Sequence, residues 1–256
     1  MVRKPSTWCA NACESSPPTP PRQTDERVVP SASAKLRIPP CSGILGYGSI
    51  GRHVARVATA MGAEVYAYTA HPRPTPESRR DRAYHVPGLG DPEGTLPARW
   101  YSGTSEAEVR TFLTSGLDLL AVAVPLTDAT RGLLGEAQFR ALHEASQAGA
   151  ADGGQKKKPR TYVTNIGRGP VVDTEALVRA LDEGWIRGAA LDVTDPEPLP
   201  DNHPLWRKDN VIITPHISGN SDHYIDRLLS ILDINLGRLS RGEEKFINQV
   251  NKKQGY

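Results

Sequence analysis

The sequence is poor in several features that would point to particular classes of protein. It has three cysteines among 256 residues, and their spacing matches neither a disulfide framework nor a zinc site. No run of about 18 apolar residues is present, as a membrane-spanning helix would need. The net charge of +2 gives little of the basic surface that nucleic-acid-binding proteins use. We therefore expect a cytosolic, cytoplasmic protein without a membrane, nucleic-acid or metal partner.

Proline and serine are concentrated in the first 40 residues, which hold eight of the 22 prolines. This stretch has no apolar periodicity, so it offers no face that could pack against a core. It also holds six basic and three acidic residues, which leaves the rest of the chain with 25 basic and 26 acidic residues. We predict a disordered tail over residues 1–40, one domain over residues 41–242 and a short C-terminal segment over residues 243–256.

After the tail, short apolar runs alternate with segments of helical periodicity, which is typical of a parallel sheet buried on both faces. The runs predict six strands, at residues 42–46, 64–69, 117–124, 161–166, 188–193 and 211–214. Helices are predicted between them at residues 50–61, 106–114, 136–146, 174–183 and 222–241. Residues 70–104 contain six prolines and predict an irregular excursion. The pattern as a whole predicts an α/β fold with a doubly wound parallel sheet.

The segment GYGSIG at residues 46–51 follows the first predicted strand and opens the first predicted helix. Three spaced glycines alone are a weak signal, but this position between strand and helix is the one that dinucleotide-binding loops occupy. Gly46 allows a tight turn, Gly48 lets the backbone approach a pyrophosphate, and Gly51 lets helix and strand pack closely. The helix N-terminus also favours negative charge. We therefore predict a dinucleotide site at this loop.

The end of the second predicted strand, VYAYTAHPR, lacks the acidic residue that accepts from the ribose 2′-hydroxyl in sites that prefer NAD. Thr69 or Ala70 stands where that acid is expected, so no carboxylate there would repel a 2′-phosphate. Arg73 follows, and a guanidinium suits bidentate binding of phosphate. We predict that NADP(H) is preferred over NAD(H). The alternative is that Arg73 only lies on a solvent-exposed loop.

Three further motifs, each at the end of a predicted strand, hold charged side chains: Arg168 in NIGRGPVVD, Glu197 in DVTDPEPLP and His216 in TPHISG. Reduction of a 2-oxo acid needs a cation for the carboxylate and the carbonyl, and an acid that protonates the new oxyanion. Arg168 and His216 suit these roles, and Glu197 suits a partner that stabilises the imidazolium. Each residue alone also has an ordinary structural explanation. Their positions at successive strand ends favour one shared site.

Together these motifs resemble the nucleotide-binding domain of the D-isomer-specific 2-hydroxyacid dehydrogenases, over about residues 42–241. The resemblance implies a Rossmann fold in which Arg168, Glu197 and His216 correspond to the family's catalytic arginine, glutamate and histidine. It also implies cofactor contacts at Ser49, Ile50, Pro125, Thr130, Ile166, Asp192 and Gly219. The stretch YTAHPRP is similar to the corresponding part of the NADPH-preferring glyoxylate and hydroxypyruvate reductases of this family.

The resemblance does not extend to the family's second, substrate-binding domain, most of which precedes the nucleotide-binding domain. The proline-rich tail stands in its place, and residues 243–256 resemble its C-terminal remnant. Two hypotheses follow from this difference. The chain is an oxidoreductase that transfers a hydride between NADP(H) and a small 2-oxo acid, such as glyoxylate or hydroxypyruvate; alternatively, it is a truncated dinucleotide-binding module without catalysis, with a regulatory role.

Apolar residues over positions 225–239 recur at helical spacing in the last predicted helix. We expect the start of this stripe to belong to the core, where the helix meets the sheet. We expect its distal end to be bare, and an exposed apolar patch favours association, for instance into a homodimer.

Overall fold

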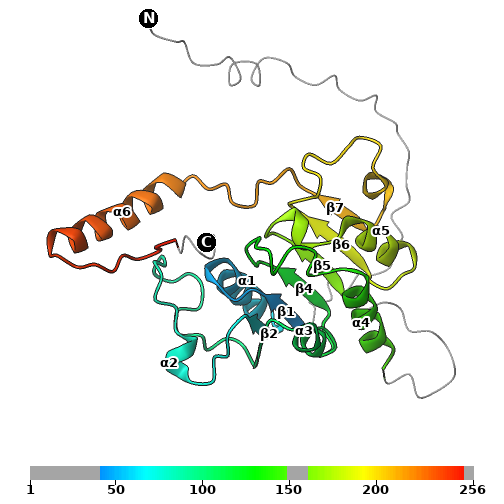
Figure 1. The fold of residues 1–256 in the computed structure, drawn as a ribbon, viewed down its shortest axis with the longest axis horizontal. Coiled ribbons are helices and arrows are strands. Elements are labelled where there is room, and N and C mark those ends of the chain that lie inside the picture. The colour runs from blue at the N-terminus through cyan, green and yellow to red at the C-terminus, as the bar shows by residue number, and fades with distance from the viewer. Residues whose placement is uncertain (1–40, 149–160, 251–256) are drawn as a thin grey trace, which may run out of the picture. The chain divides into compact units, whose positions relative to one another are not determined.

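The computed structural model describes residues 41–148 and 161–250, which form a parallel sheet with helices on both of its faces (Figure 1). The predicted tail over residues 1–40 and the end of the predicted C-terminal segment lie outside the described residues. No helix in the described ranges is long and apolar enough to cross a membrane.

Seven parallel strands make up the sheet, one more than the sequence predicts. The strands are β1 (Cys41–Leu45), β2 (Glu64–Thr69), β3 (Arg99–Ser102), β4 (Leu119–Val122), β5 (Tyr162–Asn165), β6 (Gly188–Leu191) and β7 (Val211–Ile213). The α-helices are α1 (Ser49–Ala60), α2 (Pro76–Arg79), α3 (Glu106–Leu113), α4 (Glu136–Gln147), α5 (Thr174–Asp182) and α6 (Tyr224–Ser240). Short 3₁₀ helices lie at η1 (Gly169–Val171) and η2 (Pro204–Arg207).

The strand order is β3-β2-β1-β4-β5-β6-β7, so the chain runs outward in one direction from β1 and then in the other from β4. Ser42 of β1 lies opposite Val65 of β2 on one side and Leu119 of β4 on the other. Because all strands are parallel, the loops after their carboxyl ends meet at one edge of the sheet. Doubly wound sheets bind ligands at that edge, where the strand order reverses.

Successive residues of the central strands enter two different apolar clusters, as the pleat of a strand requires. Leu45 belongs to a large cluster with Phe112 of α3 and Phe139 of α4, and residues of α5 pack in the same cluster. Ile44 belongs to a smaller cluster with Tyr47 and with Ala55 of α1. Helix α1 therefore covers one face of the sheet, and α3, α4 and α5 cover the other. The predicted doubly wound α/β fold is confirmed.

The predicted irregular excursion over residues 70–104 is partly wrong, because it contains α2 and the edge strand β3. Thr75 begins α2 with a side-chain cap, accepting a hydrogen bond from the Ser78 amide. Strand β3 has the sequence RWYS and, among the strands that the structure describes, pairs only with β2; none of its four residues is buried. A short strand at the edge of a sheet needs no continuous apolar run, so the apolar pattern of the sequence does not indicate β3.

The predicted helix ends agree well with the structure. Ser105 and Glu108 form a reciprocal capping box at the start of α3. The Asp173 carboxylate accepts a hydrogen bond from the Ala176 amide and caps α5. Gly62 and Gly184, just past α1 and α5, have φ angles of 88° and 66°. Such angles strain residues that carry a Cβ, so glycine is the preferred residue at these ends.

The expectation that the start of α6 belongs to the core is wrong. Within the described part of the chain, none of its residues is buried, and Ile225, Leu229 and Leu232 are each at least half exposed. The expected burial of both sheet faces also fails at β7, where the Ile212 side chain is 59% exposed. Helical periodicity identifies an apolar stripe but does not determine what covers it.

We predict that Gly51→Ala destabilises the domain whereas Gly48→Ala does not. A Cβ at position 51 would lie 2.2 Å from the Gly46 carbonyl oxygen, and neither backbone segment can move freely. A Cβ at position 48 meets no atom within 4 Å, and the φ of −90° there suits alanine. Urea unfolding should show a loss of roughly 1–3 kcal/mol for Gly51→Ala. Equal stability of the two variants would contradict this packing.

Candidate active site

The glycine loop between β1 and α1 is shaped by close backbone contacts. Gly46 has a φ of +102°, and a Cβ there would lie 2.8 Å from the carbonyl carbon of Ala123, at the end of β4. Gly51 packs equally closely on the Gly46 carbonyl. Gly48, in contrast, faces open space. The three predicted glycine roles therefore have distinct structural counterparts: a turn, an open approach and a close packing.

Helix α1 begins at Ser49 without a capping side chain, and its first turn contains no acidic residue. The amide groups of a first helical turn have no partner within the helix and carry part of the positive end of the helix dipole. Ser49 and Ile50 are exposed at this end, and the Ile50 side chain is 58% exposed. The loop and the helix end together fit the pyrophosphate of a dinucleotide.

The other positions of expected cofactor contact also lie on loops at the carboxyl edge of the sheet. After β4, the Thr130 hydroxyl donates to the Pro125 carbonyl at 2.6 Å and accepts from the Thr127 amide at 2.8 Å, which fixes this turn. Ile166 directly follows β5, and its amide donates to the Val122 carbonyl. Gly219 is exposed after β7.

Asp192, directly after β6, is 5% exposed and binds the loop that follows β7. Its carboxylate accepts from the Thr214 hydroxyl at 2.6 Å and the Ser218 hydroxyl at 2.6 Å, and from the amides of Ile217 and Ser218 at 2.9 and 3.0 Å. Burial would raise its pKa, but these hydrogen bonds outweigh burial and lower the pKa to about 2. The ionised carboxylate therefore fixes the loop that carries His216.

Glu197 and His216 lie in direct contact. The Glu197 Oε1 atom is 2.6 Å from His216 Nδ1, and both side chains are more than 40% exposed. His216 has a φ of 53°, and its amide donates to the carbonyls of Asp192 at 2.9 Å and Thr214 at 3.0 Å. A left-handed conformation is costly for a residue with a Cβ and is often found where function requires it. Because this contact uses Nδ1, the second ring nitrogen, Nε2, is left for another partner.

Arg168 lies on the loop after β5, and its exposed guanidinium donates to the Gly167 carbonyl at 2.7 Å. The buried Asn165 amide fixes this loop, donating to the Arg168 carbonyl at 3.0 Å and accepting from the Gly167 amide at 3.1 Å. Among the described residues, Arg168 has no hydrogen bond or ion pair with Glu197 or His216. The structure joins two members of the predicted trio directly and places the third on a neighbouring loop.

The loops that carry Arg168 and Glu197 are packed against each other. A Cβ at Gly169 would lie 1.8 Å from the Thr194 carbonyl oxygen, so glycine is needed for this approach. The Thr174 hydroxyl also donates to the Asp195 carbonyl at 2.7 Å. These contacts fix the spacing between the arginine loop and the glutamate loop.

Several residues that shape the site were not found from the sequence. Asn165 orients the arginine loop, and Thr214 and Ser218 orient the carboxylate of Asp192. Their polar side chains at strand ends were the available signal. Arg52 is also unexpected: it lies one residue after the glycine loop, in the apolar stretch of α1, and is only 4% exposed.

Residues 40–89 and 101–218 match the model of the D-isomer specific 2-hydroxyacid dehydrogenase NAD binding domain. The chain belongs to this family. The match includes the glycine loop, Arg168, Glu197 and His216, but leaves residues 90–100 unmatched.

Curated relatives include several glyoxylate reductases. The chain is 34% identical over 193 residues to human glyoxylate reductase/hydroxypyruvate reductase, covering 75% of this chain and 47% of that protein. It is 33% identical over 201 residues to the glyoxylate reductase of Aeropyrum pernix, covering 78% of this chain and 49% of that protein. The chain thus spans about half the length of these relatives.

Solved structures in the same family share the fold. A dehydrogenase from Xanthobacter autotrophicus in complex with NADPH has a TM-score of 0.61 and 29% identity, over 84% of this chain and 72% of that one. The NADPH-dependent glyoxylate/hydroxypyruvate reductase of Sinorhizobium meliloti, in complex with NADP, has a TM-score of 0.62 and 28% identity. The match covers 84% of this chain and 57% of that one.

We predict that Asp192→Asn destabilises the domain at neutral pH. We also predict that the stability of the variant depends less on pH in the acid range. A carboxyl with a lowered folded pKa stabilises the fold above the unfolded pKa of 3.8, and this contribution is lost as the pH falls towards about 2. The ionised group contributes about 2 kcal/mol by this shift. Urea midpoints measured from pH 2 to pH 7 should converge for wild type and variant at the acid end. If the urea midpoints of wild type and variant differed by the same amount at every pH, the prediction would be contradicted. The control is Asp201→Asn, which changes an exposed carboxyl.

Proposed function

We propose that this chain supplies the cofactor-binding and catalytic part of an NADP(H)-dependent reductase of small 2-oxo acids, such as glyoxylate or hydroxypyruvate. The observation that carries the proposal is the contact between Glu197 and His216 at the sheet edge that also holds the glycine loop. Residues 41–242 form the cofactor domain in this proposal, after a tail over residues 1–40. Residues 243–256 are the remnant of the substrate domain.

The residues of the glycine loop fit a nicotinamide dinucleotide. Gly48 leaves space for the pyrophosphate, and the uncapped start of α1 offers amide donors to it. Ser49 and Ile50 begin α1, Thr69 ends β2, and Arg73 lines a pocket together with Gly48. The further cofactor contacts in this proposal, on the loops after the other strands, are Pro125, Thr130, Ile166, Asp192 and Gly219. The bound cofactor supplies the hydride for reduction of the 2-oxo group.

His216 is the proton donor in this proposal. When Nδ1 donates to the Glu197 carboxylate, Nε2 of the imidazolium carries the proton that the new alkoxide oxygen receives. Glu197 stabilises the charged ring and fixes its orientation. The loop held by Asp192 keeps the histidine in place.

Arg168 binds the substrate carboxylate in this proposal. Its guanidinium uses one donor on the Gly167 carbonyl, and its remaining N–H groups are available to a carboxylate and to the carbonyl that becomes negative. The packing of Gly169 on Thr194 sets the distance between this cation and the acid–base pair.

The second candidate is a dinucleotide-binding module without catalysis. It is favoured by the exposure of Arg168, Glu197 and His216, because the described residues contain no element that covers them. Hydride transfer is aided when water is excluded from the reacting groups. Binding of the cofactor without turnover of any small 2-oxo acid would support this candidate.

We predict that the chain oxidises NADPH in the presence of glyoxylate or hydroxypyruvate and that His216→Ala lowers kcat at least about a hundredfold, because the general acid is lost. Glu197→Gln should lower kcat about tenfold. The control is His223→Ala, which removes another exposed histidine close to a carboxylate, that of Asp226 at 3.5 Å. Unchanged turnover in His216→Ala would refute the assignment of the proton donor.

We predict that Arg73→Ala raises the Kd for NADPH about tenfold and that for NADH less than twofold, because only NADPH carries the 2′-phosphate. Cofactor fluorescence titration measures both constants. Arg110→Ala, which removes an exposed arginine paired with Glu144 on α4, should change neither constant. Equal weakening of both cofactors by Arg73→Ala would disprove the proposed preference.

A further inference from the structure

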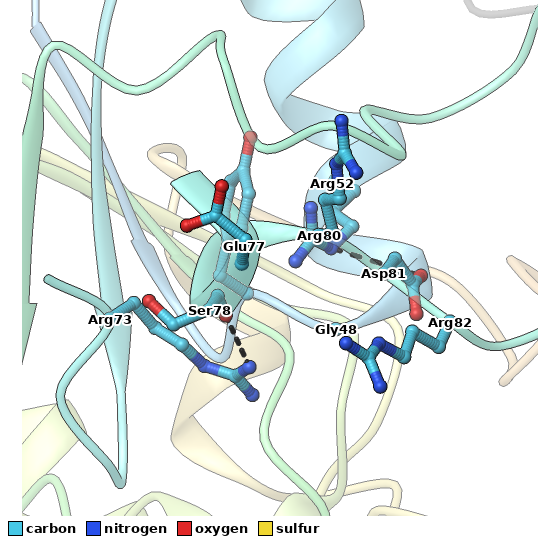
Figure 2. Close-up of a pocket in the computed structure, with 9 residues that line it drawn as sticks. Gly48, Arg52, Arg73, Glu77, Ser78, Arg80, Asp81 and Arg82 are labelled. Carbon is cyan, nitrogen blue, oxygen red and sulfur yellow. Dashed lines mark hydrogen bonds and ion pairs between the residues drawn. The ribbon is translucent and has the colours of Figure 1, made fainter. Parts of the chain in front are cut away.

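A pocket of about 450 Å³ opens beside the glycine loop, between that loop and the segment after β2 (Figure 2). Gly48 lies on one side of it, and four arginines line it: Arg52, Arg73, Arg80 and Arg82. We call it the arginine pocket. The only carboxylates among the lining residues are those of Glu77 and Asp81. An anion that reaches Gly48 therefore meets a surplus of positive charge.

Three of the four arginines already have partners. Arg52 donates to two backbone carbonyls, and Arg80 forms an exposed ion pair with Glu93 at 2.7 Å. Arg73 donates one hydrogen bond to the Ser78 carbonyl at 2.5 Å, which orients its guanidinium along the pocket wall. Arg73 and Arg80 each use one guanidinium nitrogen in these contacts, so both keep further N–H groups, but the charge of Arg80 is already paired with Glu93.

Arg82 differs from the other three. It is exposed, and among the residues that the structure describes it has no hydrogen bond or ion pair. Its guanidinium lines the same pocket as Gly48 and Arg73. The pocket therefore holds a cation that has no ion-pair partner among the described residues and that belongs to no recognisable sequence motif.

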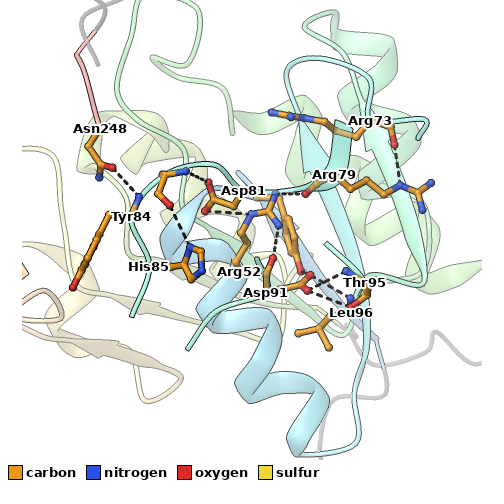
Figure 3. A network of polar contacts seen from close by, with 12 residues as sticks. Arg52, Arg73, Arg79, Asp81, Tyr84, His85, Asp91, Thr95, Leu96 and Asn248 are labelled. Atoms are coloured by element: carbon orange, nitrogen blue, oxygen red, sulfur yellow. Dashed lines mark hydrogen bonds and ion pairs between the residues drawn. The ribbon is translucent and has the colours of Figure 1, made fainter. Parts of the chain in front are cut away.

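A buried network of contacts around Arg52 and Asp91, which we call the anchor, holds the segment that includes Arg79 and Asp81 (Figure 3). The Arg52 guanidinium donates to the Asp91 carbonyl at 2.5 Å and to the Arg79 carbonyl at 2.6 Å, and lies 3.8 Å from the Asp81 carboxylate. Arg79 and Asp81 are close neighbours of Arg82 in the chain. Arg52 thus ties this part of the excursion to the first turns of α1, directly beside the glycine loop.

Asp91 completes the anchor. Its carboxylate accepts from the Tyr47 hydroxyl at 2.7 Å and from the amides of Thr95 and Leu96 at 3.0 and 3.2 Å. Burial and the contact with Asp91 raise the pKa of Tyr47, so its hydroxyl stays protonated and keeps donating. Asp91 lies within residues 90–100, which the family model leaves unmatched. The anchor therefore depends on a segment outside the matched part of the domain.

We propose that Arg82 is a second specificity-determining residue, which binds the 2′-phosphate of NADP(H) together with Arg73, and that Asp91 and Arg52 position it. This inference rests on the proposed function, because it takes the glycine loop as the dinucleotide site. A phosphate dianion between two guanidinium groups gains charge-assisted hydrogen bonds that a 2′-hydroxyl cannot provide. The anchor lowers the cost of this binding because the segment is ordered before the ligand arrives.

The test uses two adenine nucleotides that differ by the 2′-phosphate, 2′,5′-ADP and 5′-AMP, titrated calorimetrically into the full chain. We expect Arg82→Ala to weaken binding of 2′,5′-ADP about tenfold and that of 5′-AMP less than twofold. Arg82→Lys should recover part of the loss. The control, Arg207→Ala, removes an exposed arginine of η2 outside the pocket and should change neither affinity.

The positioning role has its own variant, Asp91→Asn, which keeps the shape of the side chain but weakens its hold on Tyr47. We expect it to lower the ratio of 2′,5′-ADP to 5′-AMP affinity, and we expect little additional loss in the double variant with Arg82→Ala. Thermal unfolding of each variant verifies that the domain is folded. Full additivity of the two losses would overturn the positioning role.

These outcomes separate the inference from the proposed function. If Arg73→Ala lowers the affinity for 2′,5′-ADP and Arg82→Ala does not, the inference about Arg82 is overturned while the NADP(H) preference stands. If Arg82→Ala lowers that affinity but no 2-oxo acid is reduced, the inference stands and the proposed catalysis fails. If wild type binds both nucleotides equally, both the inference and the NADP(H) preference fail.

Discussion

The parallel pairing of β1 with β4 is the constraint on which the proposed site depends. The strand order reverses at this pair, and doubly wound sheets bind ligands at the carboxyl edge beside such a reversal. Gly46 packs against Ala123 at this edge, with no room for a side chain. The same edge carries Arg168 after β5 and His216 after β7. Shared strand direction therefore brings together residues that are up to 170 positions apart.

Buried charge has two different roles around this edge. Asp192 is an anion surrounded by four donors, which lower its pKa and fix the histidine loop. Arg52 is a cation for which burial lowers the pKa, yet a guanidinium remains charged at neutral pH and finds carbonyl acceptors on the excursion. In both places, a charge that would be costly to bury alone is bound by groups from distant loops and so holds those loops together.

Much of the fold could be predicted from the sequence because the central strands are buried on both faces. Strand β2 has the predicted bounds, and α1 and α3 differ from prediction by about one residue at an end. Strand β3 could not be predicted, because its sequence, RWYS, has no apolar run and the strand lies at an edge of the sheet. The apolar stripe of α6 was recognised, but its burial depends on other elements that periodicity does not specify.

The candidate site shows the same division. Glu197 and His216 could be paired from their motifs, and the structure places them 2.6 Å apart. The proposed partner of Arg73, Arg82, could not be found that way, because the segment that carries it is held by Arg52, whose guanidinium donates to the carbonyl of Asp91, 39 residues after Arg52 in the chain. Short motifs identify residues near strand ends, whereas the excursion needs three-dimensional contacts to acquire a defined shape.

A crystal structure of this chain with NADP⁺ would test the central claim most directly. The account predicts the pyrophosphate over Gly48 and the start of α1, the 2′-phosphate in the arginine pocket, and the nicotinamide ring on the side of Glu197 and His216. A dinucleotide bound away from the glycine loop, or with its nicotinamide directed away from His216, would contradict it.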